Sequence, residues 1–356
     1  MELGVTTLVL NCGSSSVKYA LFSGEVEVRR RQIDHADGVT AALDEIADRP
    51  TAVGHRLVHG GPAHRRPVRI DDAVLASLHE AIPFAPLHLP IELAAIAAVR
   101  RRFGEVPQVA CFDTAFHEHM PEVARRLALP APLFDAGIQS YGFHGLSYEY
   151  LASVVPTRPR AVYAHLGNGA SMVAVRDGLS IDTTMGFTPT GGLVMGTRSG
   201  DLDPGVLLYL LARGYDHRAL ARLVDHEAGL LALSGATSDM RELLATCASD
   251  PRAALAVDVF CYRAKKALGG FVAVLGGLDL LVFTGGIGES AAHVRQEICA
   301  GLGGFGISLD HDRNATSAPS IGDGACEVRV IKTDEAAVIA RHTRALVYAG
   351  GSVATS

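Results

Sequence analysis

The feature that most constrains this chain is a stretch of twenty residues, 182–201, with neither a helical nor a strand period. It contains five glycines, one proline and six threonines or serines, but only three charged residues, Asp182, Arg198 and Asp201. Its apolar residues argue against disorder, so the pattern predicts a long structured loop, which in a compact domain is usually functional. Arg198 stands among small residues, a setting that suits binding of a carboxylate or phosphate. A structural glycine loop with a surface arginine is the alternative.

Length and charge narrow the class of protein. A chain of 356 residues predicts two domains, at about 150 residues each. A net charge of −6 gives no electrostatic reason to expect nucleic acid or an anionic membrane as a partner. The six cysteines are scattered without a CxxC pair, and residues 1–4 lack the features of a secretion signal. We therefore expect a cytoplasmic protein with reduced thiols.

One apolar run, 267–288, is long enough to cross a membrane. It contains Asp279 and seven glycines, however, so a helix followed by a buried strand explains it better. We expect no membrane partner.

Two segments, one near the start of each half, predict a β-hairpin with a small polar turn. The first turn is Asn11-Cys12-Gly13-Ser14-Ser15-Ser16, and the second is His165-Leu166-Gly167-Asn168-Gly169-Ala170. Such turns offer backbone N–H groups and hydroxyls that can cradle a phosphate without a basic cluster. The repetition suggests a duplicated architecture. For the first hairpin alone, a plain serine-rich turn is the simpler interpretation.

Between the hairpins, polar residues follow predicted strands. Arg56 lies in a strand that ends in glycines, and Asp113 directly follows strand 109–112, at the kind of strand end where α/β folds place ligand-binding groups. His144 stands between glycines in a loop. The segment His117-Glu118-His119 lacks the spacing of a helix-borne metal pair, so we predict no metal site there.

The remainder of the chain predicts mainly helices. Helical periodicity covers 206–213, 218–225 and 252–268, and Ser238 or Asp239 is expected to cap a further helix. Strand 278–283 is expected to run into a glycine turn, 284–289, and then a helix, 290–300, an arrangement that suits a nucleotide.

Residues 301–306 match GxGxxG, but they follow a helix and precede a strand, the reverse of a dinucleotide site. Strand 328–331 precedes a terminal helix that ends near Leu346. Thr333 or Asp334 should cap this helix, with Glu335 in its first turn.

Together these motifs resemble the acetate kinase family of acyl kinases, within the actin/Hsp70/sugar-kinase (ASKHA) fold class. The resemblance runs nearly end to end and rests on seven motifs in order: residues 11–19, 54–61, 112–117, 141–145, 165–169, the loop 182–201, and 283–289. It implies an α/β fold of two domains, each with a duplicated βββαβαβα core, around an inter-domain cleft. The expected boundaries are 1–145 plus 340–356 for the first domain and 146–339 for the second, nucleotide-binding domain.

The resemblance also implies an activity and a homodimer. The reaction would be reversible, Mg²⁺- or Mn²⁺-dependent transfer of the γ-phosphate of ATP to acetate or propionate, giving an acyl phosphate and ADP. Carried over by motif, the metal residues are Asn11 and Glu335. The catalytic residues are Arg56, Asp113, His144 and Arg198. The nucleotide residues are Ser14, Ser16, Lys18, His165, Gly167, Asn168, Gly169, Asp239, Met240, Arg241, Gly286 and Ile287. The acyl pocket is formed by Val58, Leu87, Phe143 and Pro189.

The chemistry is consistent with these assignments. A carboxylate with a pKa of about 4–5 is already ionised near neutral pH and needs no general base. It needs positive charge and positioning to approach another anion, which two arginines and a metal ion would supply. Asp113 then orients the substrate or a metal-bound water.

The sequence departs from the family pattern at four places. The span between Lys18 and Arg56 is shorter than usual, and Tyr148 stands where the family usually has His. Pro189-Thr190-Gly191-Gly192 replaces Pro-Leu-Glu-Gly, and Leu87-His88-Leu89-Pro90 replaces Leu-His-Asn-Pro. Two of these departures adjoin the expected acyl pocket, so the preferred carboxylate stays open. Alternatives are a butyrate kinase-like or other short-chain acyl kinase, and a nucleotide-binding regulator that has lost transfer.

Overall fold

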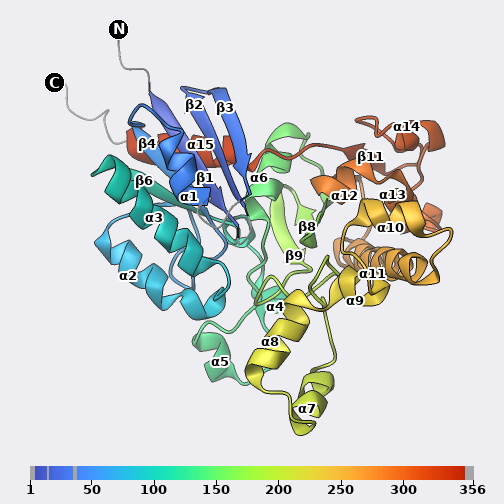
Figure 1. Cartoon of the computed structure of the whole chain (residues 1–356). Coiled ribbons are helices and arrows are strands. Elements are labelled where there is room, and N and C mark those ends of the chain that lie inside the picture. The colour runs from blue at the N-terminus through green and yellow to red at the C-terminus, as the bar shows by residue number, and fades with distance from the viewer. Residues whose placement is uncertain (1–4, 14–15, 35–37, 349–356) are drawn as a thin grey trace. The chain divides into compact units, whose positions relative to one another are not determined.

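The computed structural model describes residues 5–13, 16–34 and 38–348 (Figure 1). Within these residues the chain forms two compact units. The first takes its residues from Met1–Glu118, Phe143–Tyr150 and Asp334–Ser356, and the second from His119–Gly142 and Leu151–Thr333. The domain boundaries predicted above stay a prediction, because the density of internal contacts does not by itself define a functional domain.

The first unit is built on one mixed sheet. Its strands are β1 (Thr6–Cys12), β2 (Val17–Ser23), β3 (Val26–Ile33), β4 (Ala52–Leu57), β5 (Val68–Arg69) and β6 (Gln108–Phe112). Its helices are α1 (Gly38–Asp44), α2 (Asp72–Glu80), η1 (Ile82–Phe84), α3 (Leu89–Phe103), η2 (Ala115–His117) and α15 (Glu335–Tyr348), together with the first part of α6 (Gly145–Val154).

The second unit contains the other sheet and most of the helices. Its strands are β7 (Arg160–Leu166), β8 (Ala170–Arg176), β9 (Leu179–Thr183), β10 (Leu280–Thr284) and β11 (Glu327–Val330). Its helices are α4 (Glu122–Arg125), α5 (Ala131–Asp135), α7 (Pro204–Ala212), α8 (His217–His226), α9 (Gly229–Ser234), α10 (Met240–Thr246), α11 (Pro251–Leu275), α12 (Gly285–Ser290), α13 (Ala292–Cys299), η3 (Gly303–Phe305) and α14 (His311–Ala315).

The two sheets have the same topology. The strand order is β3-β2-β1-β4-β6-β5 in the first and β9-β8-β7-β10-β11 in the second. In each, the first three strands form an antiparallel meander, and the next two strands of the order run parallel to the first strand of that meander. The predicted duplicated α/β core is therefore confirmed, with the short strand β5 as an addition at one edge.

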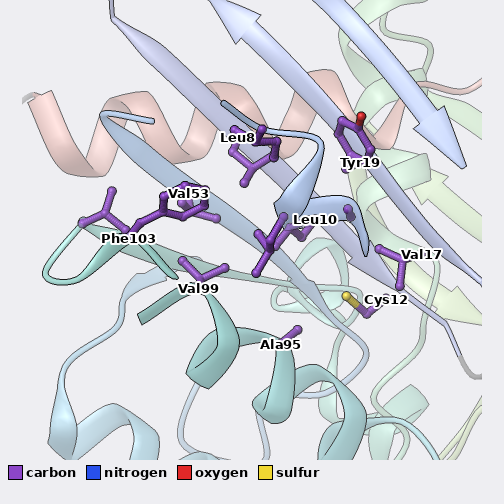
Figure 2. Packing of buried hydrophobic residues seen from close by; sticks show 13 residues of the cluster. Leu8, Leu10, Cys12, Val17, Tyr19, Val53, Ala95, Val99 and Phe103 are labelled. Atoms are coloured by element: carbon purple, nitrogen blue, oxygen red, sulfur yellow. The ribbon is translucent and has the colours of Figure 1, made fainter. Parts of the chain in front are cut away.

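Alternating side chains of β1 supply two cores on opposite faces of the first sheet. On one face, Leu10 and Val53 pack with Ala95 and Val99 of α3 and with Phe103, the last residue of that helix (Figure 2). These α3 residues recur every four positions, the spacing of one helix face. Fully burying one such side chain contributes about 1.5–3 kcal/mol.

On the other face, Val9 packs with Val338 and Ile339 of the terminal helix α15. Helix α15 can approach β4 this closely because residue 54 is a glycine. A Cβ at Gly54 would lie 2.2 Å from Oγ1 of Thr343. Asp334 caps α15 by accepting the Ala337 N–H at 3.1 Å, so one of the two predicted caps is confirmed. The helix thus brings Glu335, its first residue, to the first sheet although it is 279 positions away from Arg56 (335 − 56).

Most of the elements expected from the sequence are confirmed. Both hairpins form, as do the three helices after the loop and the helix–strand pair α11–β10 that replaces a membrane span. Among the described helices, none combines the length and apolar character that crossing a bilayer requires. Residues 184–203 carry neither helix nor strand, and Met185, Leu193 and Met195 are buried, so the predicted structured loop is confirmed except at Asp182 and Thr183, which end β9.

The expected glycine turn at 284–289 is wrong, because Thr284 ends β10 and the following residues form a helix, α12. Three glycines make a helix unlikely on local preference. Hydrogen bonds made by the side chains of Glu289 and Arg295 override this preference. Glu289 Oε1 accepts the Gly285 N–H at 3.0 Å, and the buried Arg295 donates to the carbonyls of Gly288 and Glu289 at 2.9 and 3.0 Å.

Candidate active site

In the first unit, a charged cluster lies at the carboxyl ends of the parallel strands β1, β4 and β6. Arg56 in β4 is the register partner of Asn11 in β1 and of Cys111 in β6, which leads to Asp113. Arg56 donates from Nε to Oδ1 of Asp113 at 3.2 Å and from Nη2 to Oδ2 at 2.5 Å. This two-point contact fixes the plane of the guanidinium.

The cluster keeps Arg56 charged and partly accessible. Burial alone would lower the pKa of Arg56, but the charge and hydrogen bonds of Asp113 outweigh it and raise the pKa. The Asp113 side chain is 2% exposed, whereas the Arg56 side chain is 17% exposed. The arginine is therefore held by the protein on one side and open to an anion on another.

Asn11 and Glu335, the predicted metal residues, meet in this unit. Nδ2 of Asn11 lies 3.2 Å from Oε2 of Glu335. Burial, followed by the charge of Asp113, raises the pKa of Glu335, while Arg56 and Lys18 lower it. An amide and a carboxylate side by side present the oxygen ligands that Mg²⁺ prefers.

A third acidic residue, which the sequence reasoning missed, faces Arg56. Glu92 lies in the first turn of α3 and is 1% exposed. Its two carboxylate oxygens accept the Val58 N–H at 3.2 and 3.0 Å, and Oε1 lies 3.8 Å from Nη1 of Arg56. The available signal was an acid on the apolar face of a helix, between Leu89 and Ile96.

His144 occupies an unusual backbone position in the loop before α6. Its φ is 58°, in the left-handed region that few residues other than glycine adopt. The following Gly145 donates its N–H to the Asp113 carbonyl at 2.7 Å, and a Cβ at Gly145 would lie 2.2 Å from that oxygen. His144 is thereby tied to the segment that carries Asp113.

The predicted acyl-pocket residues are divided between the units. Val58 and Phe143 are buried in the first unit, where the His59 ring lies 5.7 Å from the Phe143 ring. Leu87 belongs to the same unit and is 41% exposed. Pro189 belongs to the loop of the second unit, where its carbonyl accepts a hydrogen bond from Nη1 of Arg198 at 3.3 Å.

The first phosphate hairpin is described in part. The Gly13 N–H donates to the Ser16 carbonyl at 2.9 Å, which closes the turn. Lys18 lies on β2 opposite Asn11 and is exposed. Ser14 lies outside the described residues.

The second hairpin and two helix starts enclose a cavity in the second unit. It measures about 810 Å³ and is lined by residues from the β7–β8 turn, from the start of α10 and from α12. Seven of the predicted nucleotide residues line it: Gly167, Asn168, Asp239, Met240, Arg241, Gly286 and Ile287. Four further lining residues were missed by the sequence reasoning: Ser238, Leu244, Ser290 and Ala291. His165 and Gly169 belong to the same hairpin but are not among the lining residues.

Close backbone contacts between the β7–β8 turn and the long loop determine the shape of this cavity. Gly167 donates its N–H to the Gly169 carbonyl at 3.0 Å, and Gly196 of the long loop donates to the Asn168 carbonyl at 2.9 Å. A Cβ at Gly196 would lie 1.9 Å from Oδ1 of Asn168. Asp239 caps α10 by accepting the Arg241 N–H at 2.8 Å, which confirms the second of the two predicted caps.

Comparison with known proteins assigns the chain to a family. The model of the acetokinase family matches residues 27–341. The acetate kinase of Methylocella silvestris is 42% identical, over 96% of this chain and 97% of its own length. That of Thermosynechococcus vestitus is 46% identical, over 85% of this chain and 76% of its own length.

Solved structures agree with these sequence relatives. A propionate kinase from Francisella tularensis superposes with a TM-score of 0.90 at 35% identity, covering 96% of this chain and all of that one. The acetate kinase of Porphyromonas gingivalis gives a TM-score of 0.84 at 35% identity, covering 96% and 99%. The family model, the sequence relatives and the shared fold lead to one conclusion: the chain belongs to the acetokinase family.

Proposed function

We propose that the chain catalyses reversible transfer of the γ-phosphoryl group of ATP to acetate or propionate. The observation that carries this proposal is the Arg56–Asp113 pair at the strand ends of the first unit, with Asp113 buried and Arg56 partly accessible, in a chain with a nucleotide-sized cavity in its second unit. In the forward direction a carboxylate oxygen attacks the γ-phosphorus, the bond to the β-phosphate oxygen breaks, and ADP leaves.

The substrate carboxylate arrives ionised, so the site has to reduce repulsion between anions. In this mechanism Arg56 and Arg198 neutralise the transferring phosphoryl group, and His144 donates a hydrogen bond to its oxygens. Asp113 holds Arg56 in plane and orients the carboxylate. Val58, Leu87, Phe143 and Pro189 surround the short acyl chain.

The nucleotide binds in the cavity of the second unit. Asp239, Met240, Arg241, Gly286 and Ile287 surround adenosine, and Gly167 and Asn168 approach the phosphates with His165 and Gly169. Ser14, Ser16 and Lys18 form the first phosphate loop. Phosphate binding through backbone N–H groups explains how a chain of net charge −6 can take a highly anionic substrate.

The residues present suit Mg²⁺ or Mn²⁺ as the metal. Asn11 and Glu335 would hold or orient it, with the phosphates of the nucleotide supplying further oxygens. When bound, the ion would neutralise charge that develops on the β- and γ-phosphate oxygens. Burial raises the pKa of Glu335 although Arg56 and Lys18 lower it, and a bound cation would favour the ionised carboxylate.

An acyl-hydroxamate assay with MgATP and acetate, propionate, butyrate or no acid tests the proposal. We expect product that depends on the acid, and a loss on the order of 10³–10⁵ in turnover for Arg198→Ala. A maximum at butyrate would instead indicate a butyrate kinase-like enzyme. Nucleotide binding without product from any acid would indicate a regulator and overturn the proposal.

We further propose a homodimer that forms through α7 in the cytoplasm. Helix α7 has the sequence PGVLLYLLA, without a charged residue, and Leu208 and Tyr209 are 66% and 62% exposed. An apolar helix exposed in this way is typical of a surface that a protein partner covers. The family resemblance makes a second copy of the chain the expected partner. The six free cysteines suit a reducing compartment.

Light scattering of the purified protein tests the dimer. We expect the double substitution Leu208→Asp and Tyr209→Asp to give a monomer. Val123→Asp, which changes an isolated apolar residue that is 87% exposed, should leave the dimer intact. A wild-type monomer, or a dimer that survives the double substitution, would rule out α7 as the interface.

A further inference from the structure

Glu92 connects two residues of the first unit that have roles in the proposed function: Arg56 at the transferring phosphoryl group and Val58 in the acyl pocket. Its oxygens accept the N–H of Val58, an acyl-pocket residue, at 3.2 and 3.0 Å. The same carboxylate lies 3.8 Å from Arg56, which binds the transferring group. Arg56 and Val58 are separated by a single residue at the end of β4.

This contact uses the edge of Arg56 that Asp113 leaves open. Asp113 occupies Nε and Nη2 of the guanidinium, whereas Glu92 faces Nη1. Two carboxyl groups on different elements, the segment after β6 and the first turn of α3, therefore limit the rotation of one arginine. A guanidinium presents its donors in a rigid planar fork, so contacts at two edges define its orientation.

The Val58 contact fixes the backbone as well. Val58 is 2% exposed and follows the last residue of β4, while the preceding Leu57 carbonyl accepts the Asp113 N–H at 2.9 Å. A buried N–H without an acceptor is costly, so the carboxylate of Glu92 selects the backbone conformation in which Val58 points it toward α3. The strand end and the acyl pocket share this restraint.

We propose that Glu92 is a positioning residue for the carboxylate half of the reaction, because it fixes the Arg56 side chain and the Val58 backbone together. This inference rests on the proposed function. It concerns binding of the carboxylate and of the acyl phosphate, and it leaves unaffected the cavity of the second unit, which the proposed function assigns to adenosine.

The test measures KM for acetate, acetyl phosphate, ATP and ADP, with kcat, for wild type, Glu92→Ala, Glu92→Gln and Glu92→Asp. We expect Glu92→Ala to raise KM for acetate and acetyl phosphate at least tenfold and to change KM for ATP and ADP less than twofold. Glu92→Gln keeps an oxygen that accepts the Val58 N–H, so it should recover most of the loss. Glu92→Asp shortens the side chain and should raise KM for acetate severalfold.

Val99→Ala is the matched control, since it removes a buried side chain from the same helix without touching Arg56 or Val58. A purely structural role predicts that Glu92→Ala behaves like Val99→Ala, with a lower Tm and less active protein but unchanged KM values. That result would overturn the inference, as would equal rises in KM for acetate and ATP, or a Glu92→Gln variant no better than Glu92→Ala.

The remaining outcomes are also decisive. If Glu92→Ala does not fold, the Glu92→Asp variant decides, and an unchanged KM for acetate in that variant overturns the inference. Failure of the proposed function is a separate result, because it would show as a wild-type protein that forms no acyl phosphate.

Discussion

The two units share a strand order but differ in how they form a site. In the first, charged and polar side chains restrain one another: Arg56 contacts Asp113 and Glu92, and Glu335 contacts Asn11. In the second, the cavity is formed largely by glycine turns and helix starts. One topology thus supports two kinds of recognition. Fixed charges suit a small anion, while close backbone approach suits the phosphates of a larger ligand.

The largest expected effect comes from the charged cluster. Arg56→Lys keeps the positive charge but loses the planar fork that meets Asp113 and Glu92 at once. We expect a loss on the order of 10³ in kcat/KM for acetate, measured by the hydroxamate assay. Arg66→Lys is the control, because Arg66 pairs with Glu118 on the surface of the same unit and is 71% exposed. Near-normal turnover in Arg56→Lys would mean that charge alone is sufficient.

The corresponding substitution in the second unit is Gly285→Ala. Gly285 has a φ of 78°, and a Cβ there would lie 2.7 Å from the Leu166 carbonyl oxygen. Strain and overlap together should destabilise the protein by about 3 kcal/mol and raise KM for ATP more than KM for acetate. Denaturant unfolding and steady-state kinetics measure the two effects.

Gly301→Ala separates the effect of backbone strain from the effect of steric overlap by the added Cβ. Gly301 has a φ of 79°, but no atom lies within 4 Å of the added Cβ. We expect it to cost only about 1 kcal/mol and to leave both KM values unchanged. Equal costs at Gly285 and Gly301 would show that close backbone approach does not matter in the second unit.

The charged cluster should also make stability depend on pH. Burial raises the pKa of Glu92 to about 8, although Arg56 and the Val58 N–H lower it, while Asp113 raises it further. The folded protein then retains a proton that the unfolded chain releases near pH 4, so its stability falls as pH rises from about 5 to 8. Between about pH 5.5 and 7.5 this proton should lower the free energy of unfolding by about 2–3 kcal/mol.

Glu92→Gln removes this dependence. We expect the difference in unfolding free energy between wild type and Glu92→Gln to change by that amount over the same pH range. Urea unfolding at several pH values measures it, and the difference cancels groups common to both proteins. Parallel curves for the two proteins would contradict a protonated Glu92 in the folded state.

The smallest expected effect lies at the cavity of the second unit. Asp239→Ala removes the cap of α10, which should cost about 1 kcal/mol. The contact with Arg241 lowers the pKa of Asp239 to about 2, yet the Arg241 side chain is 86% exposed, so the ion pair itself should contribute little. Asp239→Asn keeps a cap and should restore most of the stability. A large rise in KM for ATP in both variants would mean that a side-chain charge matters here after all.

Local sequence patterns predicted the helices and strands well where the apolar period and the backbone preferences of the residues favour the same element. The period of apolar residues identified α11, and the hairpins followed from short apolar runs around small polar turns. The prediction failed at α12, where three glycines indicated a turn. Arg295, ten positions after the first residue of that helix, satisfies its terminal carbonyls in a way that no local preference reveals.

The candidate site, too, was predicted from the sequence only in part. Sequence motifs pointed to Arg56, Asp113 and Glu335, and the fold brings them into one unit because α15 packs on the sheet that carries β4 and β6. The roles assigned to these residues stay predictions. Glu92 and Leu244 escaped the sequence reasoning, since neither stands in a motif and their neighbours are defined by packing.

The sequence by itself determined the family, the duplicated strand pattern and the residue types available for chemistry, because these depend on periodicity and on ordered motifs along the chain. Only the tertiary structure decided which carboxylates face Arg56, where α12 begins and which residues line the cavity. Those features depend on contacts between segments far apart in the chain, where burial and hydrogen bonding outweigh local preference.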